Sequence, residues 1–289
     1  MTTVFVAGAT GSVGSAIVRE LYNRSFHVRA LARNRDRARS LLPFTDDIFT
    51  ADATHDSFAG ACTGVDVVIS ALGRSVSLND RSRASYHDIN YTANCRLLEE
   101  AKRSGVKKFI YVSAFKAEQL THLAYFRAHH EFSEVLRSSG IDYAIIQPTA
   151  FFSAFDDVLV QAHKGRLACP GRGECRTNPI HQDDLATLCV DAIANSRTLI
   201  PVGGPGVYTR YALLELASRA AGRPRRIPRI PLELVNIFLP ITRIFNRNMY
   251  DTLAFYMAVS STDILAPQAG GRTLEEYFAE RVPVLFSQQ

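Results

Sequence analysis

A glycine-rich loop near the amino terminus constrains the fold more than any other feature of this sequence. Residues 2–7 have the pattern of a short buried strand, and Gly8-Ala9-Thr10-Gly11-Ser12-Val13-Gly14 leads from it into a predicted helix over residues 12–24. Glycines in this strand–loop–helix order allow a tight turn, a close approach of the backbone to a pyrophosphate, and close packing of the helix on the sheet. The exposed N–H groups and the dipole of the first helical turn favour phosphate there. The loop therefore predicts a dinucleotide site formed by Gly8, Thr10, Gly11, Ser12, Val13 and Gly14.

Strands and helices alternate along the first half of the chain. Further strands are predicted over residues 27–32, 47–51, 65–70, 108–113 and 143–147, with helices over 35–42, 83–104 and 123–137. This alternation is typical of an α/β fold with a Rossmann-type, doubly wound parallel sheet. Beyond Pro148 the pattern loosens and glycine and proline become more frequent. We therefore expect a nucleotide-binding domain over residues 1–150 and a small C-terminal substrate-binding lobe over 151–289, partly interleaved with the Rossmann core.

The residues after the second strand distinguish NADP from NAD. An acidic residue about twenty positions past the loop would bind a free ribose hydroxyl, but Arg33 stands nineteen positions past Gly14. Its guanidinium can clamp a 2′-phosphate. We therefore expect NADPH to be preferred over NAD(H), with Arg33, Asn34 and Arg37 in the cofactor site. The alternative is that these arginines form a solvated basic face.

Two further segments follow strands of the predicted sheet at its carboxyl edge. Asp52 and Ala53 come after the third strand, where an aspartate can accept a hydrogen bond from the adenine amine. Ala71, Leu72 and Gly73 come after the fourth strand, where small residues let the backbone approach the cofactor. We expect all five residues in the cofactor site.

These motifs together resemble the atypical short-chain dehydrogenase/reductase superfamily in its NmrA-like branch. The resemblance runs from GATGSVG through residues 106–113, 139–149 and the Asn178-Pro179-Ile180-His181 segment. It implies that Pro148, Thr149, Ala150 and Phe151 lie near the nicotinamide end of the cofactor. The chain also resembles tailoring ketoreductases of aromatic polyketides, in particular those of simocyclinone-type angucyclinone biosynthesis, which would place it in antibiotic biosynthesis.

The catalytic pattern of this superfamily is incomplete in the chain. Ordinary members carry a serine and a YxxxK motif, whereas here Ser113 ends the fifth strand and Tyr125 is followed by His129 at the lysine position. Without a neighbouring cation, a tyrosine of pKa about 10 stays protonated near neutral pH. A phenol can still donate a proton to a developing alkoxide, so the change penalises oxidation more than reduction. Ser113, Tyr125 and His129 are therefore the candidate catalytic residues of a reductase.

Three interpretations of the pair remain open at this point. Tyr125 and His129 can act as proton donors, they can merely pack a helix in a decayed site, or the substrate can activate itself. An aromatic ketone beside a phenol hydroxyl carries its own internal hydrogen bond and needs positioning more than acid catalysis. The aromatic residues Phe151, Phe152 and Phe155 and the apolar segment 230–245 would suit a flat, apolar substrate, or they belong to the core.

Composition excludes several other classes of protein. The net charge of +5 is modest for a nucleic-acid-binding protein, and no apolar run is long enough for an integral membrane helix. Five cysteines without CxxC spacing favour a reduced, cytoplasmic protein with no metal site.

The sequence thus predicts an NADPH-dependent reductase, specifically a ketoreductase, of a small, aromatic or polyketide-like molecule. The alternatives are an NADP(H)-binding redox sensor without turnover and an enone or vinyl reductase, and the oligomeric state is left open.

Overall fold

The computed structural model describes residues 1–80 and 82–286 and contains two compact units. The first unit comprises Met1–Arg74, Ser82–Gln147 and Gln182–Pro201, and the second comprises Ser75–Arg81, Pro148–His181 and Val202–Gln289. The boundary after Gln147 lies close to the expected one at residue 150, but two segments cross it. Residues 182–201 return to the first unit because they supply a helix and a strand to its sheet.

A seven-stranded parallel sheet forms the centre of the first unit. Its strands, in spatial order, are β3 (Asp47–Thr50), β2 (His27–Ala32), β1 (Thr3–Ala7), β4 (Val67–Ser70), β5 (Lys108–Val112), β6 (Asp142–Pro148) and β9 (Leu199–Val202). Val4 of β1 pairs with Val28 of β2 on one side and with Val67 of β4 on the other. The strand order therefore reverses at β1, and ligands of such sheets bind outside the carboxyl ends of the strands at this reversal. The expected α/β fold is confirmed.

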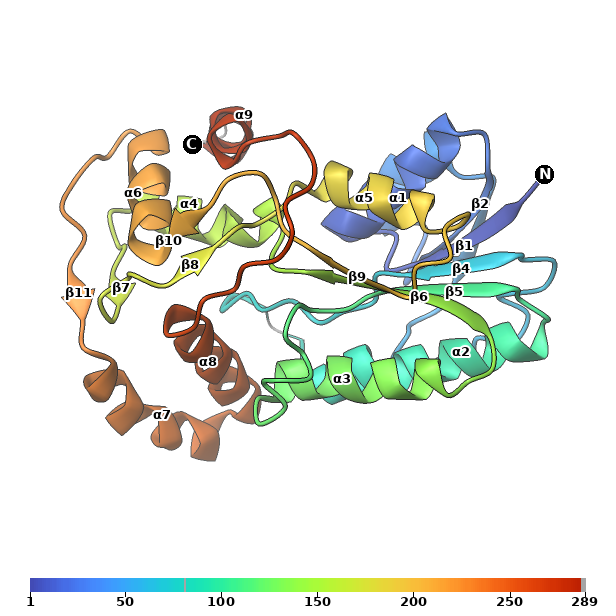
Figure 1. Ribbon diagram of the computed structural model, residues 1–289, viewed down its shortest axis with the longest axis horizontal. Helices are drawn as coiled ribbons and strands as arrows, with labels where there is room; N and C mark the ends of the chain where they lie inside the picture. Colours follow the sequence, from blue (N-terminus) through green and yellow to red (C-terminus); the bar gives the residue numbers. More distant parts are fainter. Residues whose placement is uncertain (81, 287–289) are drawn as a thin grey trace. The chain divides into compact units, whose positions relative to one another are not determined.

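Helices cover both faces of this sheet, as Figure 1 shows. One face carries α1 (Ser12–Asn23) and α5 (Gln182–Asp191), and the other carries α2 (Asn94–Arg103) and α3 (Ala124–Arg137). The buried positions of α1 include Val13, Ile17 and Leu21, the apolar stripe that the sequence shows. A 3-10 helix, η1 (Asp36–Phe44), follows β2 and contains Pro43, so the proline does not end this helix as expected.

The segment expected as one long helix over residues 83–104 is divided in two. A π-helical turn, η2 (His87–Ala93), precedes α2. The amide of Asn94 donates to the carbonyl oxygens of Ile89 and Asn90 at 3.2 and 3.0 Å, and to Leu72 O at 3.3 Å. This side chain satisfies carbonyl groups that a regular α-helix would use itself, which accounts for the wider turn. The seventh strand, β9, was also not predicted.

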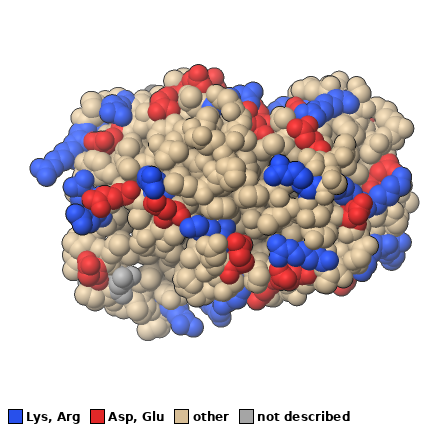
Figure 2. All heavy atoms as spheres, in the orientation of Figure 1, with Lys and Arg blue, Asp and Glu red and all other residues tan. Residues whose placement is uncertain are grey.

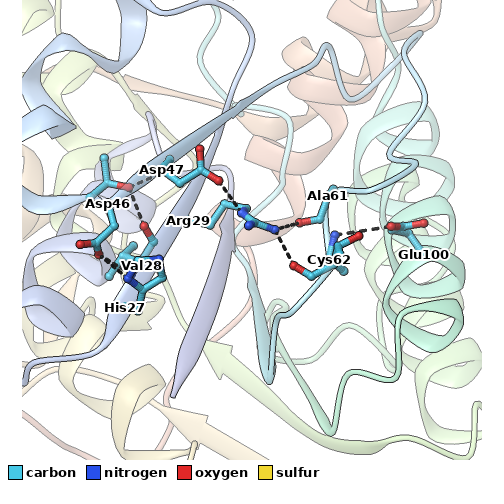
Figure 3. Close-up of polar contacts among 10 residues, drawn as sticks. His27, Val28, Arg29, Asp46, Asp47, Ala61, Cys62 and Glu100 are labelled. Atoms are coloured by element: carbon cyan, nitrogen blue, oxygen red, sulfur yellow. Dashed lines mark hydrogen bonds and ion pairs between the residues drawn. The ribbon is translucent and has the colours of Figure 1, made fainter. Parts of the chain in front are cut away.

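Arg29, in the second strand, bonds to groups of the protein itself. Figure 3 shows Arg29 of β2 donating to the Asp47 carboxylate at 2.7 Å and to the carbonyl oxygen of Ala61 at 3.0 Å. Glu100 of α2 accepts from the backbone N–H groups of Gly60 and Cys62. Arg29 and Glu100 thus fix the connection between β3 and β4, and Arg29 has a structural role.

The second unit has its own core and two small sheets. Phe152, Leu159, Cys169, Leu213 and Phe278 are among its buried residues. Its remaining elements are η3 (Phe152–Phe155), α4 (Asp156–His163), β7 (Cys169–Pro170), β8 (Arg176–Thr177), β10 (Tyr208–Thr209), α6 (Arg210–Ala220), β11 (Arg229–Ile230), α7 (Leu232–Phe245), α8 (Arg247–Ser260) and α9 (Leu274–Phe286).

Candidate functional site

The glycine loop between β1 and α1 has the geometry that a pyrophosphate requires. Gly8 has a φ of +76°, and a Cβ there would lie 2.5 Å from the carbonyl oxygen of Ala71. A Cβ on Gly14 would lie 2.1 Å from the carbonyl oxygen of Gly8, so Gly14 permits the close contact between helix and loop. A Cβ on Gly11 would meet only Gly8 O, at 3.3 Å. Gly11 therefore leaves its side of the loop open, where a phosphate can approach the backbone.

The remaining loop residues divide into exposed and buried positions. Thr10 and Ser12 are exposed at the start of α1, whereas Val13 is buried in the core. Gly11 is the N-cap of α1 and has no side chain to cap the helix, so a phosphate can take the capping role. The side chain of Val13 packs inward, which leaves its backbone as the part available to a ligand.

Arg33, Asn34 and Arg37 are exposed at the carboxyl end of β2. The side-chain oxygen of Asn34 accepts from Arg37 N at 2.9 Å, so Asn34 also has a local structural role. A hydrogen bond from the Thr54 hydroxyl lowers the pKa of Asp52, and the charge of Arg33 acts in the same direction. The ends of β2 and β3 therefore carry an exposed cation, Arg33, and a carboxylate, Asp52, whose roles toward the cofactor stay predictions.

The segment after β4 is fixed to the π-helical turn. The backbone N–H of Arg74 donates to Oδ1 of Asn90 at 2.8 Å, and Asn94 bonds to the carbonyl oxygen of Leu72. Gly73 is exposed beside these anchors. The Arg74 guanidinium is buried and lies 4.6 Å above the Tyr86 ring centre. The structure thus holds Ala71, Leu72 and Gly73 in place from one side, next to Gly8 of the phosphate loop.

His129 lies in a buried hydrogen-bond network between α3, η2 and β5. Its Nε2 is 2.9 Å from the side-chain nitrogen of Asn90, and its Nδ1 is 2.7 Å from the Tyr111 hydroxyl. Because Oδ1 of Asn90 accepts from Arg74, its NH₂ group faces His129, and an amide NH₂ can only donate. The Nε2 atom therefore accepts, and the proton of His129 resides on Nδ1.

Burial keeps this histidine neutral. Desolvation lowers the pKa of His129 to about 3, and both ring nitrogens are engaged with protein groups. The expectation that His129 donates a proton to a substrate stays a prediction, and these bonds argue against it. They indicate instead that His129 positions Asn90, and through Asn90 the backbone at Arg74.

Tyr125 lies on the same face of α3 as His129, as the i, i+4 spacing predicts. Its ring meets the His129 ring edge-on at 4.7 Å and packs against Tyr86 at 5.4 Å. Burial and the neighbouring Tyr86 raise the pKa of Tyr125 above its ordinary value. Tyr125 thus keeps its proton at neutral and moderately alkaline pH, which suits a phenol donor and not an ionised base.

Ser113 is also buried, at the end of β5. Its hydroxyl lies 3.4 Å from the hydroxyl of Ser133, which donates to the carbonyl oxygen of His129 at 2.8 Å. The structure therefore places Ser113 beside α3 at Ser133, one helical turn past His129 and about two turns past Tyr125. A catalytic role for Ser113 stays a prediction.

The residues expected near the nicotinamide end belong to the second unit, apart from the strand that leads to them. Pro148 is buried, and the hydroxyl of Thr149 donates to Asn178 O at 2.7 Å. Ala150 O accepts from Ile180 N at 2.9 Å, and Phe151 pairs with Ile180 in a bridge. These bonds fix the path of residues 148–151, and their role toward the cofactor stays a prediction.

Two asparagines that were not predicted as site residues organise this region. Asn90 and Asn94 are fully buried, and both lie in or directly after the π-helical turn. In the sequence they stand among the other polar residues of segment 87–103, so no local signal distinguishes them. Only the fold shows that they hold Leu72, Arg74 and His129.

The segment that contains the glycine loop matches a known family. Residues 8–196 match the model of a family described as NAD(P)H-binding. The chain belongs to this NAD(P)H-binding family. The match begins at Gly8, the first glycine of the loop, and ends at residue 196. It therefore includes α5 and most of segment 182–201, which returns to the first unit. Binding of NAD(P)H, expected from the loop, is therefore confirmed.

Two curated relatives cover nearly the whole chain. Divinyl chlorophyllide a 8-vinyl-reductase, chloroplastic, of Arabidopsis thaliana is 28% identical over 97% of this chain and 73% of that protein. Photosystem II assembly factor Ycf39 of Guillardia theta is 26% identical over 88% of this chain and 82% of its own. Reductases are thus among the relatives, but these matches give no support to the angucyclinone ketoreductase subtype or to a role in antibiotic biosynthesis.

A solved structure has the same fold. The NADPH-dependent quinone oxidoreductase QOR2 of Escherichia coli, complexed with NADPH, has a TM-score of 0.75 at 17% identity, covering 96% of this chain and 99% of its own. At this identity the likeness shows the fold alone.

A hollow of about 390 Å³ lies at the amino ends of the strands, lined by Thr2, Asp66, Lys108 and Asp142 among others. It is at the opposite edge of the sheet from the glycine loop and is not part of the cofactor site.

Figure 2 shows acidic and basic side chains interspersed over the visible face, unlike the basic stripe of a nucleic-acid surface. Within the described part of the chain, no helix is long and apolar enough to span a membrane.

Proposed function

We propose that this protein is an NADPH-dependent reductase of a conjugated carbon–carbon double bond in a flat, apolar molecule. The observation that carries the proposal is the packing of the Tyr125–His129 pair, in which both ring nitrogens of His129 contact protein groups and the Tyr125 ring packs against Tyr86 and His129. Burial raises the pKa of Tyr125 and lowers that of His129 to about 3. The pair therefore contains no ionised base, so it favours reduction over alcohol oxidation.

The cofactor half supports the choice of NADPH. Arg33 is exposed after β2 where NAD-binding chains carry an acidic residue, and its guanidinium can hold a 2′-phosphate as a bidentate partner. The loop from Gly8 to Gly14 would hold the pyrophosphate, and Asp52 would accept from the adenine amine. When bound, NADPH supplies a hydride at its nicotinamide ring.

A conjugated alkene suits a site that offers little acid catalysis. Addition of hydride to one alkene carbon breaks the carbon–carbon π-bond and leaves a resonance-stabilised anion, and a proton on the other carbon completes the reduction. The Tyr125 hydroxyl keeps its proton and can deliver it to that carbon. The vinyl-reductase relative from Arabidopsis thaliana favours this acceptor class over an unactivated ketone.

Carbonyl reduction is the second candidate. The uncharged Tyr125–His129 pair favours only reduction of a ketone that carries its own hydrogen-bond donor. A ketone flanked by a phenol hydroxyl carries its own hydrogen-bond donor, so its reduction does not need a charged acid in the protein. Such a substrate would use the same cofactor loop and the same hydride. We rank it second because none of the relatives named above is described as a ketoreductase.

A panel of acceptors tests the proposal. Purified protein is mixed with NADPH and with flat conjugated enones, vinyl-substituted aromatics, quinones, phenol-flanked ketones or simple ketones, and NADPH consumption is followed by absorbance. The proposal predicts turnover with conjugated alkenes and a lower kcat in Tyr125→Phe, with Tyr22→Phe as the matched surface control. Turnover confined to phenol-flanked ketones would move the function to the second candidate. Tight NADPH binding without turnover on any acceptor would make the protein a redox sensor.

The remaining expectations concern context. A small-molecule ligand follows from the proposed reaction, and a cytoplasmic location stays a prediction. The apolar residues expected to line a substrate pocket differ in their exposure. Phe152 is buried in the core of the second unit against Tyr277. Phe151 and Phe155 are partly exposed and remain candidates for substrate contact.

A further inference from the structure

Helix α7 carries an apolar face that is exposed among the residues that the structure describes. Its exposed apolar residues recur at helical spacing, and Ile244 and Phe245 are 82% and 84% exposed. At about 100° per residue, these residues fall within an arc of about 100° on one side of the helix. They are Leu234, Ile237, Ile241, Ile244 and Phe245, and we call them the α7 outer face.

The opposite side of α7 is the one that packs on the protein. Leu232, Val235 and Leu239 are partly buried, and α8 lies alongside α7 (Figure 1). The outer face is therefore additional to the apolar stripe that a surface helix needs for its own packing. A contiguous exposed apolar patch of this kind marks an interaction surface.

A strongly basic segment runs directly into and out of this helix. Between Arg223 and Arg247, six arginines stand against one acidic residue, Glu233, which gives a net charge of +5. This equals the net charge of the whole chain, so the rest of the sequence is neutral on balance. The six are exposed, and among the described residues none is ion-paired with a carboxylate: Arg223, Arg225, Arg226, Arg229, Arg243 and Arg247.

We propose that the α7 outer face and these arginines dock the protein on an anionic lipid surface. An interfacial helix buries its apolar face at the boundary between headgroups and acyl chains, while nearby basic residues attract anionic lipids. Here the arginines flank the α7 outer face in sequence, and Arg229 and Arg243 lie over the rings of Tyr211 and Tyr250. A nucleic acid would neutralise the arginines but leave the apolar residues in water. Isologous pairing of two copies would bring two surfaces of net positive charge together.

Vesicle sedimentation of the full chain with NADPH present tests this proposal. The protein is mixed with vesicles of phosphatidylcholine alone or of phosphatidylcholine with phosphatidylglycerol. We expect binding to the anionic vesicles that weakens as salt is raised. Arg225→Gln/Arg226→Gln is expected to lower the partition coefficient roughly thirtyfold, from the usual contribution of each basic residue near an anionic surface. Ile237→Glu/Ile244→Glu is expected to abolish binding.

Matched controls separate docking from misfolding. Val284→Glu changes an exposed apolar residue on α9, and Arg172→Gln removes an exposed arginine outside the basic segment; both are expected to bind as the wild type does. Circular dichroism checks that each variant is folded. The proposal is overturned if folded wild-type protein stays in the supernatant with anionic vesicles. It is also overturned if the wild type is a dimer that Ile237→Glu/Ile244→Glu converts to a monomer while vesicles bind neither.

Discussion

The side-chain amide of Asn90 donates to Nε2 of His129 across 2.9 Å, in the interior between η2 and α3. This contact fixes the tautomer of the histidine and leaves its proton on Nδ1, facing the Tyr111 hydroxyl at 2.7 Å. The residue that replaces the usual lysine is therefore part of a closed network. Its consequences for stability and for catalysis can be separated experimentally.

The first prediction concerns stability and pH. The pKa of His129 is about 3 in the folded protein against 6.5 for an ordinary histidine, so the unfolded chain binds more protons between these values. Stability therefore falls as pH decreases below about 6.5, by roughly 2 kcal/mol from this group between about pH 7 and pH 5. Urea unfolding at the two pH values measures the change.

The control for this prediction is a second histidine. His129→Gln should lose most of the pH dependence, whereas His122→Gln, which changes an exposed residue, should keep it. An unchanged pH dependence in His129→Gln would show that His129 is not the buried neutral group described above.

The second prediction concerns the choice of cofactor. Arg33→Gln should weaken NADPH binding roughly tenfold to a hundredfold, the range for loss of a hydrogen bond to a charged group. NADH binding should change little because NADH lacks the 2′-phosphate. Arg39→Gln is the matched control, since Arg39 is 80% exposed and lies 3.4 Å from Asp36. Titration calorimetry with both cofactors gives the comparison, and equal losses for NADPH and NADH would contradict the assignment.

The third prediction separates two glycines of one loop. A Cβ on Gly14 would meet the backbone oxygen of Gly8 at 2.1 Å, so Gly14→Ala should cost about 1–3 kcal/mol of stability. A Cβ on Gly11 has only a 3.3 Å contact, so Gly11→Ala should fold normally but bind NADPH less well, because the methyl group occupies the approach to the pyrophosphate. Thermal unfolding and cofactor titration are measured on both variants. A Gly11→Ala variant that binds NADPH normally would place the pyrophosphate elsewhere.

The fourth prediction concerns the pH dependence of the rate. Because Tyr125 has a raised pKa and His129 has a lowered one, neither changes protonation between about pH 6 and pH 9. The kcat for reduction should therefore be nearly constant across this range. A decline in kcat with an apparent pKa near that of an ordinary histidine, lost in His129→Gln, would show that His129 is a proton donor after all.

The cofactor half of the fold was predictable because its signals are local. The glycines of the loop, the strand before them and the helix after them are adjacent in sequence, and the same holds for Arg33 at the end of β2. Each signal depends on a turn or a strand end, which short-range sterics determine. The sheet and its two helical faces followed from the alternation of these elements.

The surroundings of the candidate catalytic residues were less predictable because their contacts are long-range. The spacing of Tyr125 and His129 predicts that they share a helix face, but nothing in it shows that Tyr111 and Asn90 occupy both nitrogens of His129. The π-helical turn at η2 depends on the Asn94 side chain, which bonds to Leu72 across the fold. Strand β9 was missed because it contains Pro201 and lies beyond Pro148, where the alternation of strands and helices loosens.

The account is tested most directly by following the hydride itself. The protein is incubated with a flat conjugated enone and with NADPH that carries deuterium at nicotinamide C4, on each face in separate samples, and the product is examined by mass spectrometry. We predict a reduced alkene that contains one deuterium from one of the two labelled cofactors. If NADPH binds tightly but is recovered unchanged, and no acceptor of the panel gains deuterium, the protein is not a reductase and the central claim is wrong.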